Sequence, residues 1–597
     1  MQIHSTKVRC FLIHLLCVIL FFFTSTVQIH AQGTWAALRD TAPALNNGVM
    51  LLLTDGTIIT TVTTDPNAFW DDSCGPAWNK LTPDSTGSYL NGTWSVIAPM
   101  INSRIYFSSQ VLQNGNVYVA GGEFGTGGGK AELYDPLANT WSSIPGIPAA
   151  NNLLDPNSQM LPDGRILQNS VFPSTPFLGA QNFIYNPDSN TISAGPLCLA
   201  NDDEACWTKL PDNSILFENA GSSTAERYIP ALNTWIPDAS LPVSLYDIYG
   251  SETGPGLILP DGRAFFLGSN GYTAYYTPSG DTTNGQWAPG PTIPNHCGTP
   301  DAPAAMMRDG HILCAFSPVP DGSSIDSIFH TTTYFYDFNY TTDSFTNVGA
   351  PNGQPAYNQP SGAMIMLNLP DGNVLLGIEG SNQYYIYTPG NLPLAAGKPT
   401  IDTITQAACN FMITGTLFNG ISQGAAFGDD WQMATNYPVV SLIANGHTWY
   451  ARTTRWNRTG IQTGTLPDTA YFTVPSTIAP GNYALLLSAN GISSDTFNFA
   501  YSPCTIAVTE IEAPANSISV VPNPAHYKTE LWFTAEIAGP YTLRVTDILG
   551  RVLLSEQGSA QSGKNVHSLQ LSGLSSGIYL ANIIKGAESF VARLVVQ

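Results

Sequence analysis

Short apolar runs and tight turns alternate along most of this chain, and the turns form a regular series. Seven times an apolar run ends at an Asp-Gly or similar dipeptide and a second apolar run follows. The dipeptides begin at Asp55, Asn114, Asp163, Asp212, Asp261, Asp309 and Asp371. The four intervals between Asn114 and Asp309 are each 48 or 49 residues long, and the two outer intervals are longer, as loop insertions would make them. Two apolar runs around such a turn predict a β-hairpin, and a repeat of this length is typical of propeller blades.

Each repeat continues after its hairpin with a tyrosine, a polar turn and a strand that usually contains tryptophan, as in residues 139–145. Four short antiparallel strands of this kind make one blade. The seventh repeat has Tyr387 but no such fourth strand, whereas residues 33–43, ahead of the first turn, supply one that contains Trp35. We therefore predict an all-β, seven-bladed propeller closed by the N-terminal strand, which leaves no open sheet edge. The alternative, a sandwich of many short strands, does not explain the period.

The blade pattern resembles the kelch type, with Gly-Gly after the second strand, tyrosine before the turn and tryptophan in the fourth strand. The period stops after Pro389, and residues 396–504 show short strands separated by turn residues, which predicts an immunoglobulin-like sandwich. Within it, residues 427–438 resemble a loop of the sandwich domains that follow propellers in galactose oxidase-like proteins. Asp429 and Asp430 in this loop are candidate calcium ligands, with solvated or helix-capping carboxylates as the alternative. The predicted domains are thus a propeller over 32–395 and a sandwich over 396–504.

The last segment follows a polar linker, residues 505–517, and is again rich in strands. It opens with Val-Pro-Asn-Pro at residues 521–524 and later contains Gly-Ile-Tyr-Leu at residues 577–580. Residues 518–597 resemble the type A C-terminal sorting domain of the type IX secretion system of Bacteroidota, which is a small β-sandwich. The resemblance implies that the type IX machinery is a partner, that the chain crosses the outer membrane, and that this domain is removed on release or surface attachment.

The first residues predict export. Lys7 and Arg9 precede an apolar run over residues 10–23, and residues 29–31 look like a cleavage site, so residues 1–31 read as a signal peptide. The run is too short to span a bilayer, and no later stretch is long enough, so the mature chain is expected to be secreted or at the outer cell surface. With 21 basic against 43 acidic residues and a net charge of −22, nucleic acid is not an expected partner.

Export also permits disulfides, and the mature chain has seven cysteines. Cys409 and Cys504 flank the first and last strands of the predicted sandwich and are the favoured pair. Cys198 with Cys206 would close a small loop, and Cys297 with Cys314 is a third candidate pair. Cys74 would then be left over.

Candidate binding residues lie on the loops that share one face of a propeller, where side chains converge on the central channel. These loops are acidic and aromatic, which suits stacking on sugar rings or binding a cation; a plain solvated rim is the alternative. The candidates are Arg104, Tyr106, Asp202, Asp203, Glu204, Trp207, Tyr249, Glu252, His296, Asp301 and Tyr357.

Residues 33–504 resemble galactose oxidase-like proteins, but the copper-radical ligands are not matched. Residues 103–109 are similar to a stretch whose arginine contacts substrate, which implies a ligand role for Arg104. Arg104→Ala is then expected to weaken ligand capture and to change stability by no more than about 1 kcal/mol. The expected cysteine is absent from residues 44–49, and Tyr357 is followed by Asn358 rather than histidine. Because asparagine is a poor replacement for imidazole as a copper ligand, copper is not expected.

These observations favour a non-catalytic binding module for an extracellular glycan or protein. The alternative is a carbohydrate-active or galactose oxidase-like enzyme that uses the channel face, because paired carboxylates can cleave glycosides or assist through a metal ion. No catalytic residue is assigned. Calcium is the one cofactor that the sequence suggests, and enzymatic activity stays undecided.

Overall fold

The computed structural model describes residues 33–63, 74–147, 153–170, 180–200, 204, 206–407, 409–428, 431–503, 518–586 and 588–597. Strands account for 49% of the residues and helices for 3%, so the fold is all-β as predicted. The chain forms two compact units, Met1–Pro503 and Cys504–Gln597. The predicted signal peptide and linker lie outside the described residues.

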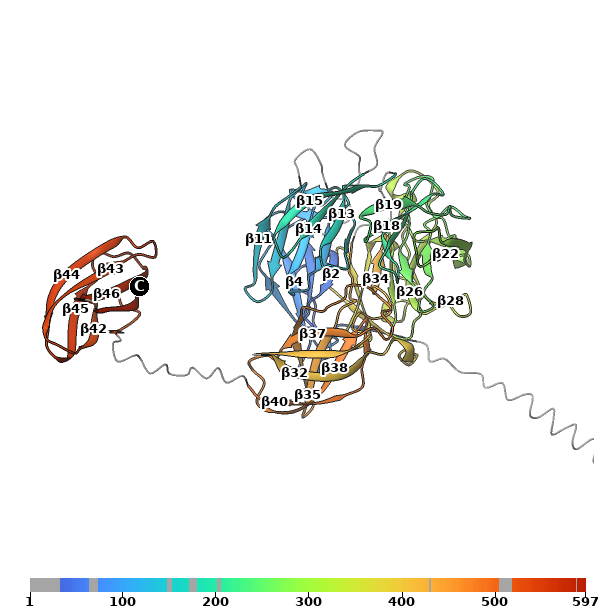
Figure 1. The fold of residues 1–597 in the computed structure, drawn as a ribbon. Coiled ribbons are helices and arrows are strands. Elements are labelled where there is room, and N and C mark those ends of the chain that lie inside the picture. Colours follow the sequence, from blue (N-terminus) through green and yellow to red (C-terminus); the bar gives the residue numbers. More distant parts are fainter. Residues whose placement is uncertain are drawn as a thin grey trace, which may run out of the picture. The chain divides into compact units, whose positions relative to one another are not determined.

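Seven sheets of the first unit share one design, in which four antiparallel strands follow one another across the sheet (Figure 1). The first three sheets consist of β2 (Leu45–Leu52), β3 (Ile58–Thr63), β4 (Trp78–Thr82) and β5 (Thr93–Ile97); β7 (Ser108–Val111), β8 (Val117–Ala120), β10 (Ala131–Asp135) and β11 (Thr140–Ile144); and β12 (Ser158–Met160), β13 (Ile166–Asn169), β14 (Gln181–Asn186) and β15 (Thr191–Leu197). The next two consist of β16 (Thr208–Lys209), β17 (Ile215–Glu218), β18 (Ala225–Ile229) and β19 (Thr234–Pro237); and β20 (Gly256–Ile258), β21 (Ala264–Leu267), β22 (Thr273–Thr277) and β23 (Gln286–Pro289). The last two consist of β25 (Pro303–Met306), β26 (Ile312–Pro318), β27 (Tyr334–Asn339) and β28 (Ser344–Asn347); and β29 (Met364–Asn368), β30 (Val374–Ile378), β31 (Tyr385–Thr388) and β1 (Thr34–Ala37).

Short elements connect these strands. They are β6 (Arg104–Ile105) paired with β9 (Phe124–Gly125), β24 (Cys297–Gly298) paired with β26, the helix α2 (Ile325–Ile328), and the 3-10 turns η2 (Pro294–His296), η3 (Pro351–Gly353), η4 (Ser361–Ala363) and η5 (Ala395–Gly397).

The seven turns join the first and second strands of their sheets, and one local interaction explains why they recur. In every one the Asp or Asn side chain accepts the backbone N–H of the residue two positions later, for example Thr57 N–H to Asp55 Oδ1 at 3.0 Å. The residue between them is left-handed, with φ of +76° at Gly56 and +68° at Asn213. Glycine and asparagine adopt that region most readily, so the dipeptide itself dictates the hairpin.

The N-terminal strand completes the seventh sheet, as the missing fourth strand of the last repeat predicted. In the pairing of β1 with β31, Trp35 lies opposite Tyr387. The Trp35 ring packs against Phe335 and Tyr387 with centroid distances of 4.9 and 4.8 Å, and its Nε1 donates to the Gly349 carbonyl at 3.1 Å. The tryptophan therefore fixes the strand to its own sheet and to the neighbouring one.

Residues 400–501 form the sheet strands β32 (Thr400–Ala407), β33 (Asn410–Thr416), β35 (Val439–Ala444), β36 (His447–Thr454), β37 (Asp468–Thr473), β38 (Gly481–Ala489), β39 (Ile492–Ser493) and β40 (Phe497–Tyr501). Their apolar side chains share one core with the preceding sheets, as the joint burial of Leu51 and Leu442 shows. One further strand, β34 (Ala425–Phe427), leaves this group and pairs with β25, and Figure 1 shows it between the other sheets. Residues 423–428 and 431–434 around it, here called the inserted segment, reach the first strands of several sheets; Ser109 Oγ, for example, donates to the Gln432 carbonyl.

The second unit has a core of its own, built from residues such as Phe533, Leu543 and Ile583. One sheet consists of β41 (Ile518–Val521), β42 (Lys528–Ala535) and β45 (Gly563–Gln570). The other consists of β44 (Val552–Ala560), β43 (Gly539–Thr546), β46 (Gly577–Lys585) and β47 (Glu588–Val596).

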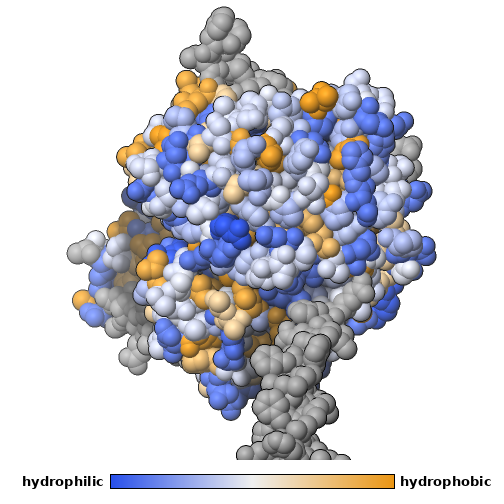
Figure 2. All heavy atoms as spheres, turned by 90° about the vertical axis from the view of Figure 1, so that its right-hand side faces the viewer, coloured by the Kyte–Doolittle hydropathy of each residue, from blue (hydrophilic) through white to orange (hydrophobic). Residues whose placement is uncertain are grey.

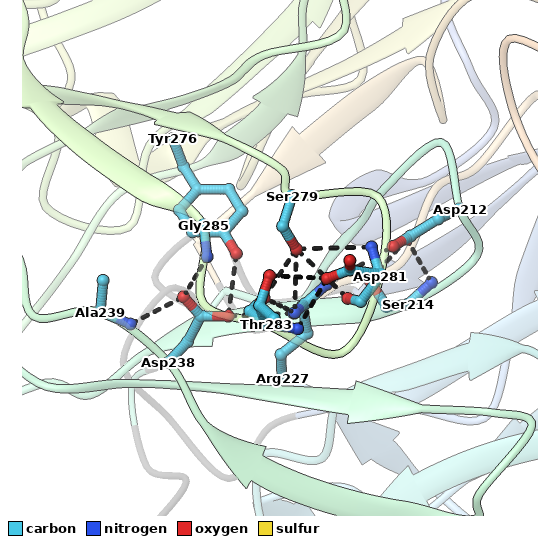
Figure 3. A network of polar contacts seen from close by, with 10 residues as sticks. All are labelled: Asp212, Ser214, Arg227, Asp238, Ala239, Tyr276, Ser279, Asp281, Thr283 and Gly285. Carbon is cyan, nitrogen blue, oxygen red and sulfur yellow. Dashed lines mark hydrogen bonds and ion pairs between the residues drawn. The ribbon is translucent and has the colours of Figure 1, made fainter.

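A buried ionic network joins two neighbouring sheets of the first unit (Figure 3). Arg227 on β18 is wholly buried, and its Nε lies 3.0 Å from Asp238 Oδ2. Tyr276 on β22 donates its hydroxyl to the same carboxylate oxygen at 2.9 Å. This network serves the scaffold, because its charged groups satisfy one another.

Tyr276→Phe is expected to lower the free energy of unfolding by about 1.5–3 kcal/mol, the usual range for a hydrogen bond to a charged group. Urea unfolding of the purified chain measures the difference. Tyr246→Phe is the control, since Tyr246 is half-buried and its hydroxyl has no hydrogen bond among those described. Equal stability of the two variants would contradict the prediction.

The outer surface carries little continuous apolar area on the face that Figure 2 shows. Most of that face is hydrophilic or intermediate, and apolar residues are spread in small groups among polar ones. Recognition by this face would therefore depend on particular loops rather than on one broad apolar patch.

Candidate functional site

Three predicted site residues converge at one place, and we call them the carboxylate cluster: Glu204, Glu252 and Asp301. One carboxylate oxygen from each lies within 4.8 Å of the others. Each residue stands two to four positions before the first strand of its sheet, ahead of β16, β20 and β25 respectively. Because these three sheets are consecutive, equivalent loops bring the three acids together.

Backbone hydrogen bonds hold the loops of the cluster in position. Thr253 Oγ1 donates to the Glu204 carbonyl at 2.6 Å, and the Thr253 carbonyl accepts the Asp301 N–H at 3.2 Å. Ser269 Oγ donates to the Glu252 carbonyl at 2.5 Å. Glu204 and Asp301 have positive φ values of 55° and 42°, an unfavourable backbone conformation that packed surroundings must hold in place. The side chains are thus fixed by their loops rather than free to separate.

The cluster is short of positive charge. Glu252 is 9% exposed, and burial, followed by the charges of Asp301 and Glu204, raises its pKa well above the usual range. Burial also raises the pKa of Asp301 to about 7, with Glu123 and Asp247 adding repulsion and a hydrogen bond with Glu252 opposing it. Glu252 Oε2 and Asp301 Oδ1 are buried and have no hydrogen-bond partner other than the acids of the cluster themselves. An acid group of this kind must hold a proton or a cation.

An aromatic rim lies on the two loops that carry Glu252 and Ser269. Tyr249 and Tyr272 are 43% and 52% exposed. Asn270 Nδ2 donates to the Tyr246 carbonyl at 3.0 Å, which ties the two loops together. The Asp247 carboxylate accepts the N–H groups of Tyr249 and Glu252, so Asp247 shapes its loop. Exposed tyrosines on fixed loops beside carboxylates form a surface on which a sugar ring can stack.

The inserted segment reaches the same place. A Cβ atom at Gly428 would lie 2.9 Å from Asp301 Oδ1, so glycine lets the segment pack closely against that carboxylate. A small cavity nearby is lined by the inserted segment and by Lys209. Lys209 is wholly buried, donates to the carbonyls of Met160 and Thr459, and has its pKa lowered by burial to about 7. Lys209 therefore joins residues of β12 and of the segment around Thr459, and it does not contact the cluster acids among the contacts described.

Arg104 does not have the position predicted for it. Its side chain is wholly buried, and its Nη2 forms an ion pair with Glu132. Nη1 donates to the carbonyls of Gly121 and Lys130. The guanidinium thus has internal partners and no exposed surface in this structure, and a ligand contact of Arg104 stays a prediction.

Other predicted site residues are distributed around the scaffold. Trp207 is 4% exposed and packs against Trp235, so it belongs to a core. The Tyr106 ring packs on Trp431 of the inserted segment at 5.3 Å. His296 is exposed in η2, and Tyr357 exchanges backbone hydrogen bonds with Thr333. Asp202, Asp203, Asp429 and Asp430 lie outside the described residues.

The cysteines give one correction. Cys198 and Cys206 are thiols, as are Cys297 and Cys314, so the predicted disulfides within these two pairs are wrong. Each sulfur has separate surroundings: Asn182 Nδ2 donates to Cys198 Sγ at 3.0 Å, and the Gly256 N–H donates to Cys206 Sγ at 3.2 Å. Cys409 is disulfide-bonded. Its expected partner, Cys504, lies outside the described residues, so that pairing stays a prediction.

Sequence reasoning missed Glu123, Tyr272 and Gly428. Glu123 and Tyr272 each follow the second strand of their sheets, on the other loops of the same face. An alignment of the seven repeats would have marked those positions. Gly428 had no signal in the repeats, because it comes from the inserted segment.

A second group of candidate metal ligands occurs among the described residues, formed by Asp309, His311 and Asp337. His311 Nδ1 lies 2.8 Å from Asp337 Oδ1, and Asp309 Oδ2 accepts a hydrogen bond from Asn391 at 2.8 Å. These groups satisfy one another, so the carboxylate cluster is the stronger candidate.

Comparisons with known proteins bear on both units. Residues 519–597 match the family described as secretion system C-terminal sorting domain. An F-box/kelch-repeat protein of Arabidopsis thaliana is 30% identical over 116 residues, which cover 16% of this chain and 24% of that protein, so the match spans about a quarter of the relative. A fungal alcohol oxidase of the AA5 family, solved in complex with copper, has 15% identity and a TM-score of 0.48, and the match covers 79% of this chain and 100% of that one. That likeness assigns no chemistry to this chain.

The sorting domain establishes where the protein goes. It directs secretion through the type IX system to the cell surface or the extracellular space, and the secretion machinery is therefore a partner. In the described part of the chain, no helix has the length and apolar character needed to cross a membrane.

Proposed function

We propose that the exported protein is a seven-bladed kelch-type propeller with an immunoglobulin-like domain, and that it binds an extracellular glycan without turning it over. The domain limits are those of the sequence analysis, 32–395 and 396–504, with the sorting domain at 518–597. The kelch relative and the repeated four-stranded sheets support the propeller. The seventh sheet, completed by β1, supports a closed ring.

One observation supports the binding role: the loop that carries Glu252 also carries the exposed Tyr249, and Ser269 and Asn270 tie it to the loop that carries the exposed Tyr272. Carboxylates accept hydrogen bonds from sugar hydroxyls, and tyrosine rings cover the apolar faces of sugars. A rigid pair of such loops loses little entropy on binding. A glycan is therefore a better match to this surface than a protein partner, which would need a larger apolar contact.

Tyr249→Ala is expected to weaken binding of the full chain to its best glycan on an array by about tenfold. The variant loses an aromatic contact of about 0.5–1.5 kcal/mol and also the apolar area that the ring buries against the sugar. The control is Tyr527→Ala, which removes a tyrosine that is 81% exposed in the second unit. Equal binding by both variants, or no binding by the wild-type chain to any glycan, would contradict the proposal.

The second candidate is a carbohydrate-active enzyme, and the raised pKa values of Glu252 and Asp301 favour it. A protonated acid near a second carboxylate is the arrangement that glycosidases use. Release of new reducing ends from a bound polysaccharide, abolished in Glu252→Gln, would establish this candidate. Binding without release would leave the non-catalytic role.

A further inference from the structure

We propose that Glu204, Glu252 and Asp301 bind one calcium ion. Three carboxylate oxygens within 4.8 Å of one another can ligate a single cation. The distance from calcium to a ligand oxygen is about 2.3–2.6 Å, so two oxygens on opposite sides of the ion are separated by about twice that distance. The ion would bring positive charge to a place where three carboxylates meet.

The orphaned oxygens are the observation that points to a ligand. Glu252 is more than nine-tenths buried, and its Oε2 has no hydrogen-bond partner; Asp301 Oδ1 is likewise buried without one. A buried carboxylate oxygen without a partner costs free energy. Both atoms belong to side chains that meet in the cluster, so one cation satisfies both.

The charges around the cluster point the same way. The charged groups that most strongly raise the pKa values of Glu252 and Asp301 are all acidic: Glu204, Glu123, Asp247 and Asp301 itself. A divalent ion is the compact source of positive charge that fits between loops spaced this closely.

The donor set selects the metal. All three ligands are carboxylates, which suit hard cations, whereas zinc and copper prefer sites with imidazole or thiolate. Glu204 and Asp301 are only half-buried, so water molecules can complete the larger and more irregular coordination shell of calcium. The extracellular destination of the chain makes calcium available at the site.

The test is calorimetric titration of the full chain, stripped with EDTA, with calcium chloride at pH 7.5. One ion should bind per chain. Glu252→Gln and Asp301→Asn should each weaken this binding by at least tenfold, because loss of even an outer-shell partner typically costs about 10- to 100-fold in metal affinity. Both substitutions keep the side-chain shape, and circular dichroism with thermal unfolding checks that each variant folds.

Glu379→Gln is the matched control. Glu379 is also buried, both of its oxygens lack partners, and its pKa is also raised by burial, but it belongs to no group of candidate ligands. This variant should bind calcium as the wild-type chain does. A parallel titration with magnesium chloride should give weaker binding.

Calcium binding that is absent from the wild-type chain, or unchanged in both cluster variants, overturns the proposal. The second outcome would place the ion elsewhere, for example at Asp429 and Asp430. The titration needs no glycan, so its result is independent of the proposed function.

Discussion

Replacing Arg104 by alanine is expected to lower the free energy of unfolding by about 3–5 kcal/mol, because removal of one partner leaves the other charge of a buried ion pair uncompensated. Both side chains of the Arg104–Glu132 pair are 0% exposed. Glu132 also accepts the N–H groups of Ile101 and Asn102, so the loss would loosen the chain that leads into β6. Chemical unfolding followed by tryptophan fluorescence measures the change.

Arg39→Ala is the control variant, because it removes an ion pair that is exposed rather than buried. Arg39 pairs with Asp40 at 3.0 Å, but the two side chains are 60% and 47% exposed. Solvent screens such a pair, and its loss should leave stability almost unchanged. A stable Arg104→Ala protein that had lost glycan binding would contradict this prediction and support the ligand role expected from the sequence.

Replacing Glu218 by glutamine is expected to stabilise the first unit at pH 8 and to change little at pH 4. Glu218 is 1% exposed, and burial raises its pKa from 4.5 to about 8. The folded state therefore keeps a proton that the unfolded state releases above pH 4.5. The stability that the protonated Glu218 provides is complete below pH 4.5 and is lost progressively as the pH rises to about 8. The free energy of unfolding falls by up to about 1.4 kcal/mol per pH unit and by on the order of 4 kcal/mol in total.

Urea unfolding at pH 4, 6 and 8 tests this slope. The stability difference between Glu218→Gln and the wild-type chain should grow with pH, because the amide cannot ionise. Asp188→Asn serves as the control, since Asp188 carries the same kind of acid on the exposed surface. A difference that is constant across the three pH values would show that Glu218 is ionised in the folded chain.

Local chemistry made much of the fold predictable. Each hairpin depends on contacts between neighbours, as where Asp55 accepts the Thr57 N–H, so the repeat could be recognised from the sequence. The absent tryptophan strand of the seventh repeat likewise predicted the pairing of Trp35 with Tyr387. Glu204, Glu252 and Asp301 were found because they occupy equivalent loops of that repeat.

The errors came from contacts between residues that the repeat does not relate. Nothing in residues 103–109 reveals that Glu132 lies beside Arg104 in a buried ion pair. Cys198 and Cys206 are near in sequence, but each lies in its own hydrogen-bonded surroundings. The position of Gly428 against Asp301 depends on the strand β34, which pairs with the distant strand β25.

The strand that completes the seventh sheet has a consequence for how this protein folds. β1 and β31 are at opposite ends of the repeat region, so their pairing brings together residues separated by most of the first unit. Pairings between such distant parts of a chain form slowly. Until they form, β31 has an exposed edge that can recruit strands from other molecules. A version that lacks residues 33–37 should therefore aggregate during refolding, even though all of its hairpins can still form.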